Sequence, residues 1–105
     1  MIMKEIIDKV GESAILEQLA EECAELAKAA LKLSRVMRKE NPTPVTVNDA
    51  FNNLVEEVGD VRLLLRVTDF MYDGIDTQET EKYKLQRWEN RIKLGDPKAL
   101  QFGYT

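Results

Sequence analysis

Acidic side chains recur three residues apart in two separate parts of this sequence. Glu22 and Glu25 form one pair, directly preceded by Glu21, and Glu57 and Asp60 form the other. If both segments are helical, each pair projects from one face, because residues three or four apart stack on the same side. Carboxylate oxygens are hard ligands that suit magnesium, with manganese as a substitute. The pattern predicts a divalent-cation site wherever the two faces meet.

The amino-acid composition excludes several kinds of site. The chain has no histidine and one cysteine, Cys23, so an internal disulfide and the usual zinc sites cannot form. Cys23 is expected to be a small buried residue rather than a nucleophile, because no histidine can activate it. The net charge of −4 disfavours a general nucleic-acid binder, which relies on clustered Lys and Arg. Any metal must therefore be held by oxygen.

The elements that position these residues are predicted to be helices. Residues 3–10 form a short helix, and Ser13 is the expected N-cap of a long helix over residues 14–39, which lacks Gly and Pro. A proline loop over residues 40–45 precedes a second long helix that ends near residue 72. Thr46 and Asp49 form a start similar to a capping box for this helix. A turn at residues 73–76 leads to a last helix over residues 77–93, and residues 98–105 show no period.

These elements predict one all-α domain over residues 1–105. Its expected architecture is a four-helix-bundle-like core of two long helices with shorter N- and C-terminal helices. A chain of 105 residues leaves apolar helix surface uncovered, so a homodimer or homotetramer is expected to complete the core. No segment has the length and apolarity of a membrane span or signal peptide, so no membrane association and a cytoplasmic location are expected.

The acidic pairs interrupt helical lines that are otherwise apolar. In the second long helix a polar-to-apolar line runs beside the predicted core line. The polar-to-apolar line is Asn53, Glu57, Asp60, Leu64, Val67 and Met71, and the core line is Phe51, Leu54, Val58, Val61, Leu65 and Thr68. In the first long helix the corresponding line is Ile15, Gln18, Glu22, Glu25, Ala29, Leu33 and Val36. The solvated side of that helix is predicted to be Glu17, Glu21, Lys28, Lys32, Arg35 and Lys39. Inward carboxylates repel one another and lose hydration, costs that a protein normally avoids by pairing or protonating them. A divalent cation between them would also remove this cost.

The alternative is that both acidic motifs are ordinary solvated helix surface, since glutamate is a good helix former. Each motif alone favours that interpretation. The two together, on lines that continue as apolar, favour a site.

Several further residues are candidates for contacts with a ligand. Lys84, Arg87 and Arg91 form a basic line in the last helix, beside an apolar line of Leu85, Trp88 and Ile92. They could bind phosphate oxygens, or could instead be solvated charges paired with Glu81 or Glu89. Gln18 and Asn53 each precede a predicted ligand by four residues, and could meet a sugar or base or orient the carboxylates. Trp88 could stack on a base, although packing in a core is the commoner role.

The motifs Glu21-Glu22-x-x-Glu25 and Glu57-x-x-Asp60 resemble the EExxE and ExxD signature of the MazG-like, all-alpha nucleoside triphosphate pyrophosphohydrolases. The resemblance extends over most of the chain, including the short leading helix, Gln18 and the basic run in the last helix. One departure is the interval of 31 residues between Glu25 and Glu57, which is longer than usual in that family and places the substrate specificity in question.

The resemblance implies a hydrolase that cleaves a nucleoside or deoxynucleoside triphosphate between the alpha and beta phosphates, giving the monophosphate and pyrophosphate. It implies that Glu22, Glu25, Glu57 and Asp60 are catalytic magnesium ligands and that Glu21 is secondary. Which carboxylate accepts the proton of water stays open. The other hypotheses are a helical interaction module with a basic partner, and a relative that binds nucleotides without cutting them.

Overall fold

The computed structural model describes residues 2–40 and 44–102. Its helices are α1 (Ile2–Val10), α2 (Glu12–Arg38), α3 (Val47–Met71) and α4 (Gln78–Lys93), followed by a 3-10 segment at Pro97–Leu100. No strand occurs in these residues, so the predicted all-α class with two long helices is confirmed. The chain divides into two compact units, Met1–Gly74 and Ile75–Thr105. The single domain predicted for the whole chain stays a prediction.

The start of α3 follows the sequence pattern, whereas the start of α2 does not. The Asp49 amide donates a hydrogen bond of 3.0 Å to Thr46 Oγ1, as a helix N-cap requires. Ser13 was predicted to cap α2, but this is wrong, because the helix already begins at Glu12. Gly11 is the N-cap and has a φ of 95°, a conformation that glycine adopts without strain. The chain therefore turns between α1 and α2 at one residue.

The predicted proline loop and the end of the chain are described only in part. Asn41, Pro42 and Thr43 lie outside the described residues, as do Gly103, Tyr104 and Thr105. α2 ends with Lys39 in the left-handed conformation, where its amide donates to the carbonyl oxygens of Arg35 and Val36. This arrangement satisfies carbonyls that the helix end would otherwise leave unpaired.

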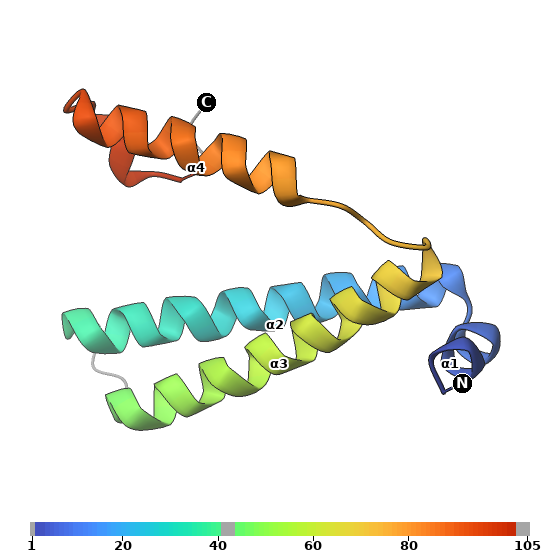
Figure 1. Cartoon of the computed structure of the whole chain (residues 1–105). Coiled ribbons are helices and arrows are strands. Elements are labelled where there is room, and N and C mark those ends of the chain that lie inside the picture. The colour runs from blue at the N-terminus through green and yellow to red at the C-terminus, as the bar shows by residue number, and fades with distance from the viewer. Residues whose placement is uncertain (1, 41–43, 103–105) are drawn as a thin grey trace. The chain divides into compact units, whose positions relative to one another are not determined.

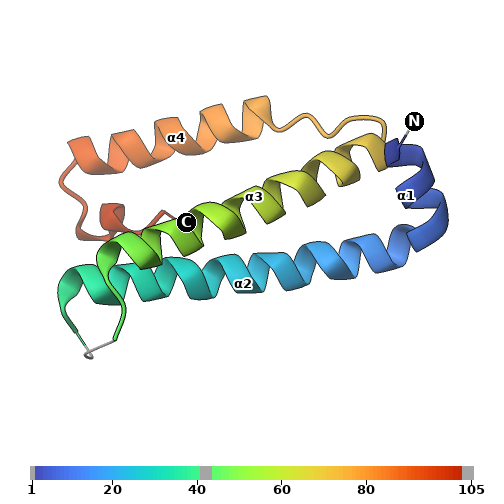
Figure 2. The ribbon, with the colours of Figure 1, turned by 90° about the horizontal axis from the view of Figure 1, so that it is seen from below.

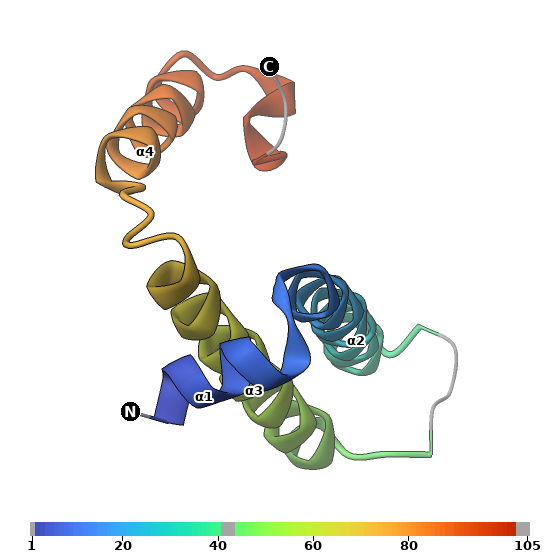
Figure 3. The same ribbon diagram turned by 90° about the vertical axis from the view of Figure 1, so that its right-hand side faces the viewer.

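The first unit is built on the pair α2 and α3, which lie side by side along most of their length (Figures 1 and 2). α1 crosses the end of this pair where α2 begins and α3 ends, and packs against both helices (Figure 3). The buried residues are Ile15, Ala29, Ala50, Val61, Val67 and Thr68. Ala29 and Ala50 are only 2% and 3% exposed, and their small side chains allow the two helices to approach closely.

Part of the predicted core line of α3 is wrong. Phe51 and Leu65 are about half exposed, at 51% and 50%, whereas Ala50 and Val67 are buried. The reason is that α2 covers α3 from one side only, so the interior line is rotated away from Phe51 and Leu65. This rotation brings the polar-to-apolar line of α3 toward α2, with Glu57, Leu64 and Met71 half-buried. The acidic part of that line therefore faces the neighbouring helix.

A long-range hydrogen bond joins the ends of the pair. Tyr72 Oη donates to Glu12 Oε1 at 2.7 Å, which connects the residue after α3 to the first residue of α2. This bond raises the pKa of the Tyr72 hydroxyl, as do burial and the charge of Glu12. The bond therefore joins the end of α3 to the start of α2.

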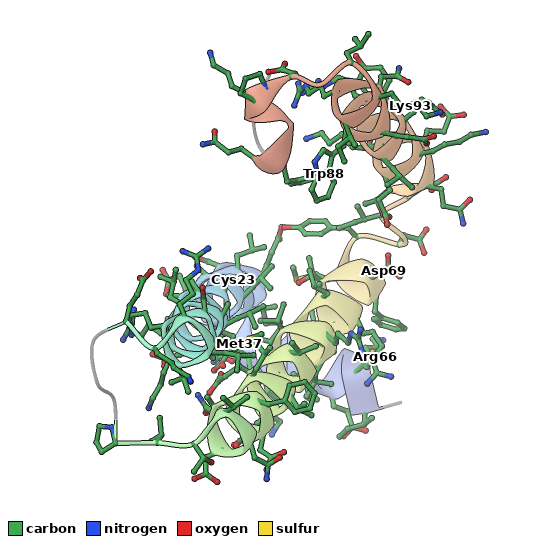
Figure 4. The ribbon with its side chains drawn as sticks, turned by 90° about the vertical axis from the view of Figure 1, so that its left-hand side faces the viewer. Cys23, Met37, Arg66, Asp69, Trp88 and Lys93 are labelled. Atoms are coloured by element: carbon green, nitrogen blue, oxygen red, sulfur yellow. The ribbon has the colours of Figure 1, made fainter. Side chains whose placement is uncertain are left out.

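The second unit consists of α4 and the residues after it. Trp88 projects from α4 and contacts Phe102 edge-on, with ring centroids 5.3 Å apart (Figure 4). The expected packing of Trp88 is thus present, but Leu85 and Ile92, which share its predicted apolar line, are exposed at 64% and 58%. Among the described residues of this unit, the 3-10 segment after α4 packs against the helix, while Leu85 and Ile92 stay uncovered.

No helix in the described part of the chain is both long enough and apolar enough to cross a bilayer.

Candidate metal centre

Three carboxylates from α2 and α3 meet at one place between the helices. One oxygen each from Glu22, Glu57 and Asp60 lies within 4.8 Å of the other two. Glu57 and Asp60 are three residues apart on α3, so they share a face, and Glu22 reaches them from the half-buried line of α2. The meeting of the two acidic faces is the geometric condition that the sequence pattern required.

Glu57 is the centre of this cluster. Its Oε2 is buried and has no hydrogen-bond partner among the described residues. Desolvation by burial raises the pKa of its carboxyl group above the ordinary 4.5, and the negative charges of Asp60, Glu22, Glu25 and Glu56 raise it further. A charged oxygen in this position is unfavourable unless a cation or proton compensates it.

The cluster fits a small hard cation. Magnesium binds oxygen ligands at about 2.1 Å, so opposite ligands in its shell are about 4.2 Å apart. The separations within the cluster are at most 4.8 Å, which is close to that spacing. An all-oxygen donor set and an unpaired buried carboxylate oxygen both match magnesium or manganese.

Glu25 lies near the cluster but outside it. Its side chain is 53% exposed, and its Oε1 lies 3.6 Å from Lys28 Nζ. It is close enough for its charge to raise the pKa of Glu57. The structure thus brings together three of the four predicted ligands, while the fourth pairs with a lysine one turn further along α2.

Of the other predicted residues of the first unit, one lines a hollow next to the cluster and the others are exposed. Asn53 and Glu57 line a hollow of about 340 Å³ between α2 and α3, whereas Gln18 and Glu21 are exposed on α2. Cys23 was predicted to be buried, and this is wrong, because the thiol is exposed. It follows Glu22 directly, and one step along a helix turns the side chain by about 100° away from α3.

The basic residues predicted to hold phosphates all belong to the second unit. Lys84 is exposed on α4, while Arg87 and Arg91 are half-buried. The guanidinium carbon of Arg87 lies 5.7 Å from the centroid of the Tyr83 ring, which is a cation–π distance. Of the two glutamates considered as partners for this line, Glu89 pairs with Lys93 at 2.8 Å and Glu81 accepts a hydrogen bond from the Thr77 hydroxyl. The role of Lys84, Arg87 and Arg91 toward a substrate stays a prediction.

The sequence interpretation missed a different set of cations. Lys28, Lys32 and Arg35 line the same hollow as Glu57, although they were assigned to the solvated side of α2. Their spacing of four and three residues was a signal that they share one face. It could not reveal that this face borders α3.

Scans of protein-family models, of curated proteins and of solved structures each found no match to this chain.

Proposed function

We propose that this protein is a magnesium-dependent nucleoside triphosphate pyrophosphohydrolase, which cleaves between the alpha and beta phosphates to give a nucleoside monophosphate and pyrophosphate. The observation that carries the proposal is the meeting of Glu22, Glu57 and Asp60 between two helices, with one buried Glu57 oxygen unpaired. The MazG-like motif that these residues form supports the choice of reaction. The hollow beside Glu57 offers room for the phosphates.

Each residue has a defined task in this reaction. Glu22, Glu57 and Asp60 would hold magnesium, which neutralises phosphate charge and makes water a better nucleophile near neutral pH. A side-chain rotation that releases Lys28 would add the Glu25 carboxylate to this set, either as a further ligand or as the acceptor of the proton from water. Asn53 lies on the wall of the hollow, where its amide can donate to a phosphate or sugar oxygen.

The test is an assay of pyrophosphate release from a panel of nucleoside and deoxynucleoside triphosphates with magnesium present. Glu57→Gln and Asp60→Asn should each lower turnover by at least about 100-fold, since each removes a charged ligand of the metal. Glu17→Gln is the matched control, because Glu17 is exposed on α2 and takes no part in the cluster. Circular dichroism of each variant should show unchanged helix content.

Wild-type turnover in both Glu57→Gln and Asp60→Asn would overturn the proposed mechanism. A helical interaction module would release no pyrophosphate from any nucleotide and would show no magnesium-linked rise in melting temperature. A relative that binds nucleotides without cutting them would show that rise but no turnover.

We further infer that the protein acts as a homodimer or homotetramer. Val47, Phe51 and Val55 are each about half exposed and stand four residues apart, which forms one apolar strip on α3. Gly59 continues the strip, and a Cβ built there would meet no heavy atom of another described element within 4 Å. Contiguous exposed apolar surface is typical of an interface, and a residue without a side chain allows close approach of another helix.

A further inference from the structure

The hollow beside the metal centre has opposite charge at its two ends. Glu25 and Glu57 lie at the end that joins the acidic cluster. Lys28, Lys32 and Arg35 line the hollow further along α2, and the helix rise places Lys28 and Arg35 about 10 Å apart along the axis. All of these residues belong to the first unit, so the hollow does not depend on where α4 lies. Such a site suits a ligand that carries a metal-binding group and an extended anionic tail.

Two of the three cations have no partner of opposite charge among the residues that the structure describes. Lys28 Nζ lies 3.6 Å from Glu25. Among residues 2–40 and 44–102, by contrast, the side chains of Lys32 and Arg35 form neither an ion pair nor a hydrogen bond. Lys32 is half-buried on the wall of the hollow, and its flexible side chain can bring the ammonium group to an anion bound there. An anion bound in the hollow would supply the counterion that both cations lack among the described residues.

We propose that Lys32 and Arg35 bind the beta and gamma phosphates of the substrate and hold the pyrophosphate product after cleavage. The orientation rests on the proposed function: the alpha phosphate lies at Glu22, Glu57 and Asp60, and the tail extends along α2 toward Arg35. Arg35 can grip two phosphate oxygens at once, whereas Lys32 acts as a point charge. The terminal phosphates thereby contact α2.

The experiment measures binding of inorganic tripolyphosphate to the full chain by calorimetry, with and without magnesium. Lys32→Gln and Arg35→Gln should each weaken binding by about tenfold, because each removes one charge-assisted hydrogen bond. Lys32→Arg, which keeps the charge, should restore most of the affinity. Arg66→Gln is the control, since Arg66 projects from α3 away from α2 (Figure 4). The same two Gln variants should raise the inhibition constant of pyrophosphate in the hydrolysis assay.

The outcomes separate this inference from the proposed function. Loss of tripolyphosphate affinity in Lys32→Gln and Arg35→Gln supports the anion site even if no nucleotide is hydrolysed. Hydrolysis by the wild type together with unchanged tripolyphosphate affinity in both variants overturns the anion site and leaves the metal-dependent reaction standing. An equal loss in Arg66→Gln would also overturn it, because the effect would then reflect total charge alone.

Discussion

Glu57 combines three properties that normally oppose each other: it is acidic, half-buried and surrounded by other acids. Its raised pKa shows that the carboxylate form is unfavourable in the protein without a cation. The same residue therefore weakens the metal-free fold and binds metal once magnesium is supplied. This opposition gives a stability test that needs no substrate.

Glu57→Gln should make the metal-free protein more stable at pH 7 than the wild type. The pKa of Glu57 is higher in the folded state than its ordinary 4.5, so the unfolded chain loses this proton first as the pH rises. In the presence of a chelator, wild-type stability should therefore fall as the pH rises from 4.5 through the raised pKa, and the Gln variant should lack this fall. Thermal unfolding between pH 4 and 8 measures both.

With magnesium present at pH 7, the wild type should become more stable than Glu57→Gln. Magnesium stabilises the form that binds it by an amount that grows with its concentration above the dissociation constant. The wild type should gain in melting temperature on titration, and Glu57→Gln should gain much less. An equal gain in both proteins would show that the ion binds elsewhere.

At the scale of single helices, Thr46 and Ser13 form a natural pair for comparison. Thr46 accepts the hydrogen bond from the Asp49 amide, whereas Ser13 lies inside α2 and makes no capping bond. Thr46→Ala should therefore lower the free energy of unfolding by about 1 kcal/mol, and Ser13→Ala should have almost no effect. Chemical denaturation of the two variants checks this. Equal losses would mean that Ser13 caps α2 in solution.

The close approach of α2 and α3 depends on small side chains. Ala29→Leu should destabilise the protein by about 1–3 kcal/mol, because the larger side chain must displace α3. Ala27→Leu makes the same change on the exposed side of α2 and should have an effect within about 0.5 kcal/mol. Ala29 also lines the hollow, so its variant should bind tripolyphosphate more weakly as well. A neutral Ala29→Leu would indicate that the helices separate easily.

Helix positions were largely predictable from the sequence because local signals determine them. The N-cap at Thr46 and the proline, glycine and turn residues mark the breaks between helices. The inward direction of the Glu57 line was predictable because it ends in Leu64, Val67 and Met71. Lys32 and Phe51 could not be placed correctly, since their surroundings depend on how far α3 is rotated against α2. That rotation is a tertiary property that helical periodicity does not contain.

At the scale of the whole molecule, the apolar strip of Val47, Phe51 and Val55 on α3 stays exposed in a single chain. We predict that the protein sediments as a dimer or tetramer, with a melting temperature that rises with protein concentration. Phe51→Glu should shift it toward the monomer, because a charge would be placed in the middle of the exposed strip. Lys4→Glu, an exposed change on α1, should leave the assembly intact. A monomeric wild type at high micromolar concentration would contradict this prediction.

The cations of the hollow, in a chain that is acidic as a whole, affect how fast a polyphosphate associates with it. A chain of net charge −4 repels a polyphosphate at long range, while Lys32 and Arg35 attract it only nearby. In dilute buffer the long-range repulsion should slow association. At physiological ionic strength, where fields decay over about 8 Å, the local attraction should dominate encounter. The association rate constant should therefore first rise with added salt and then fall.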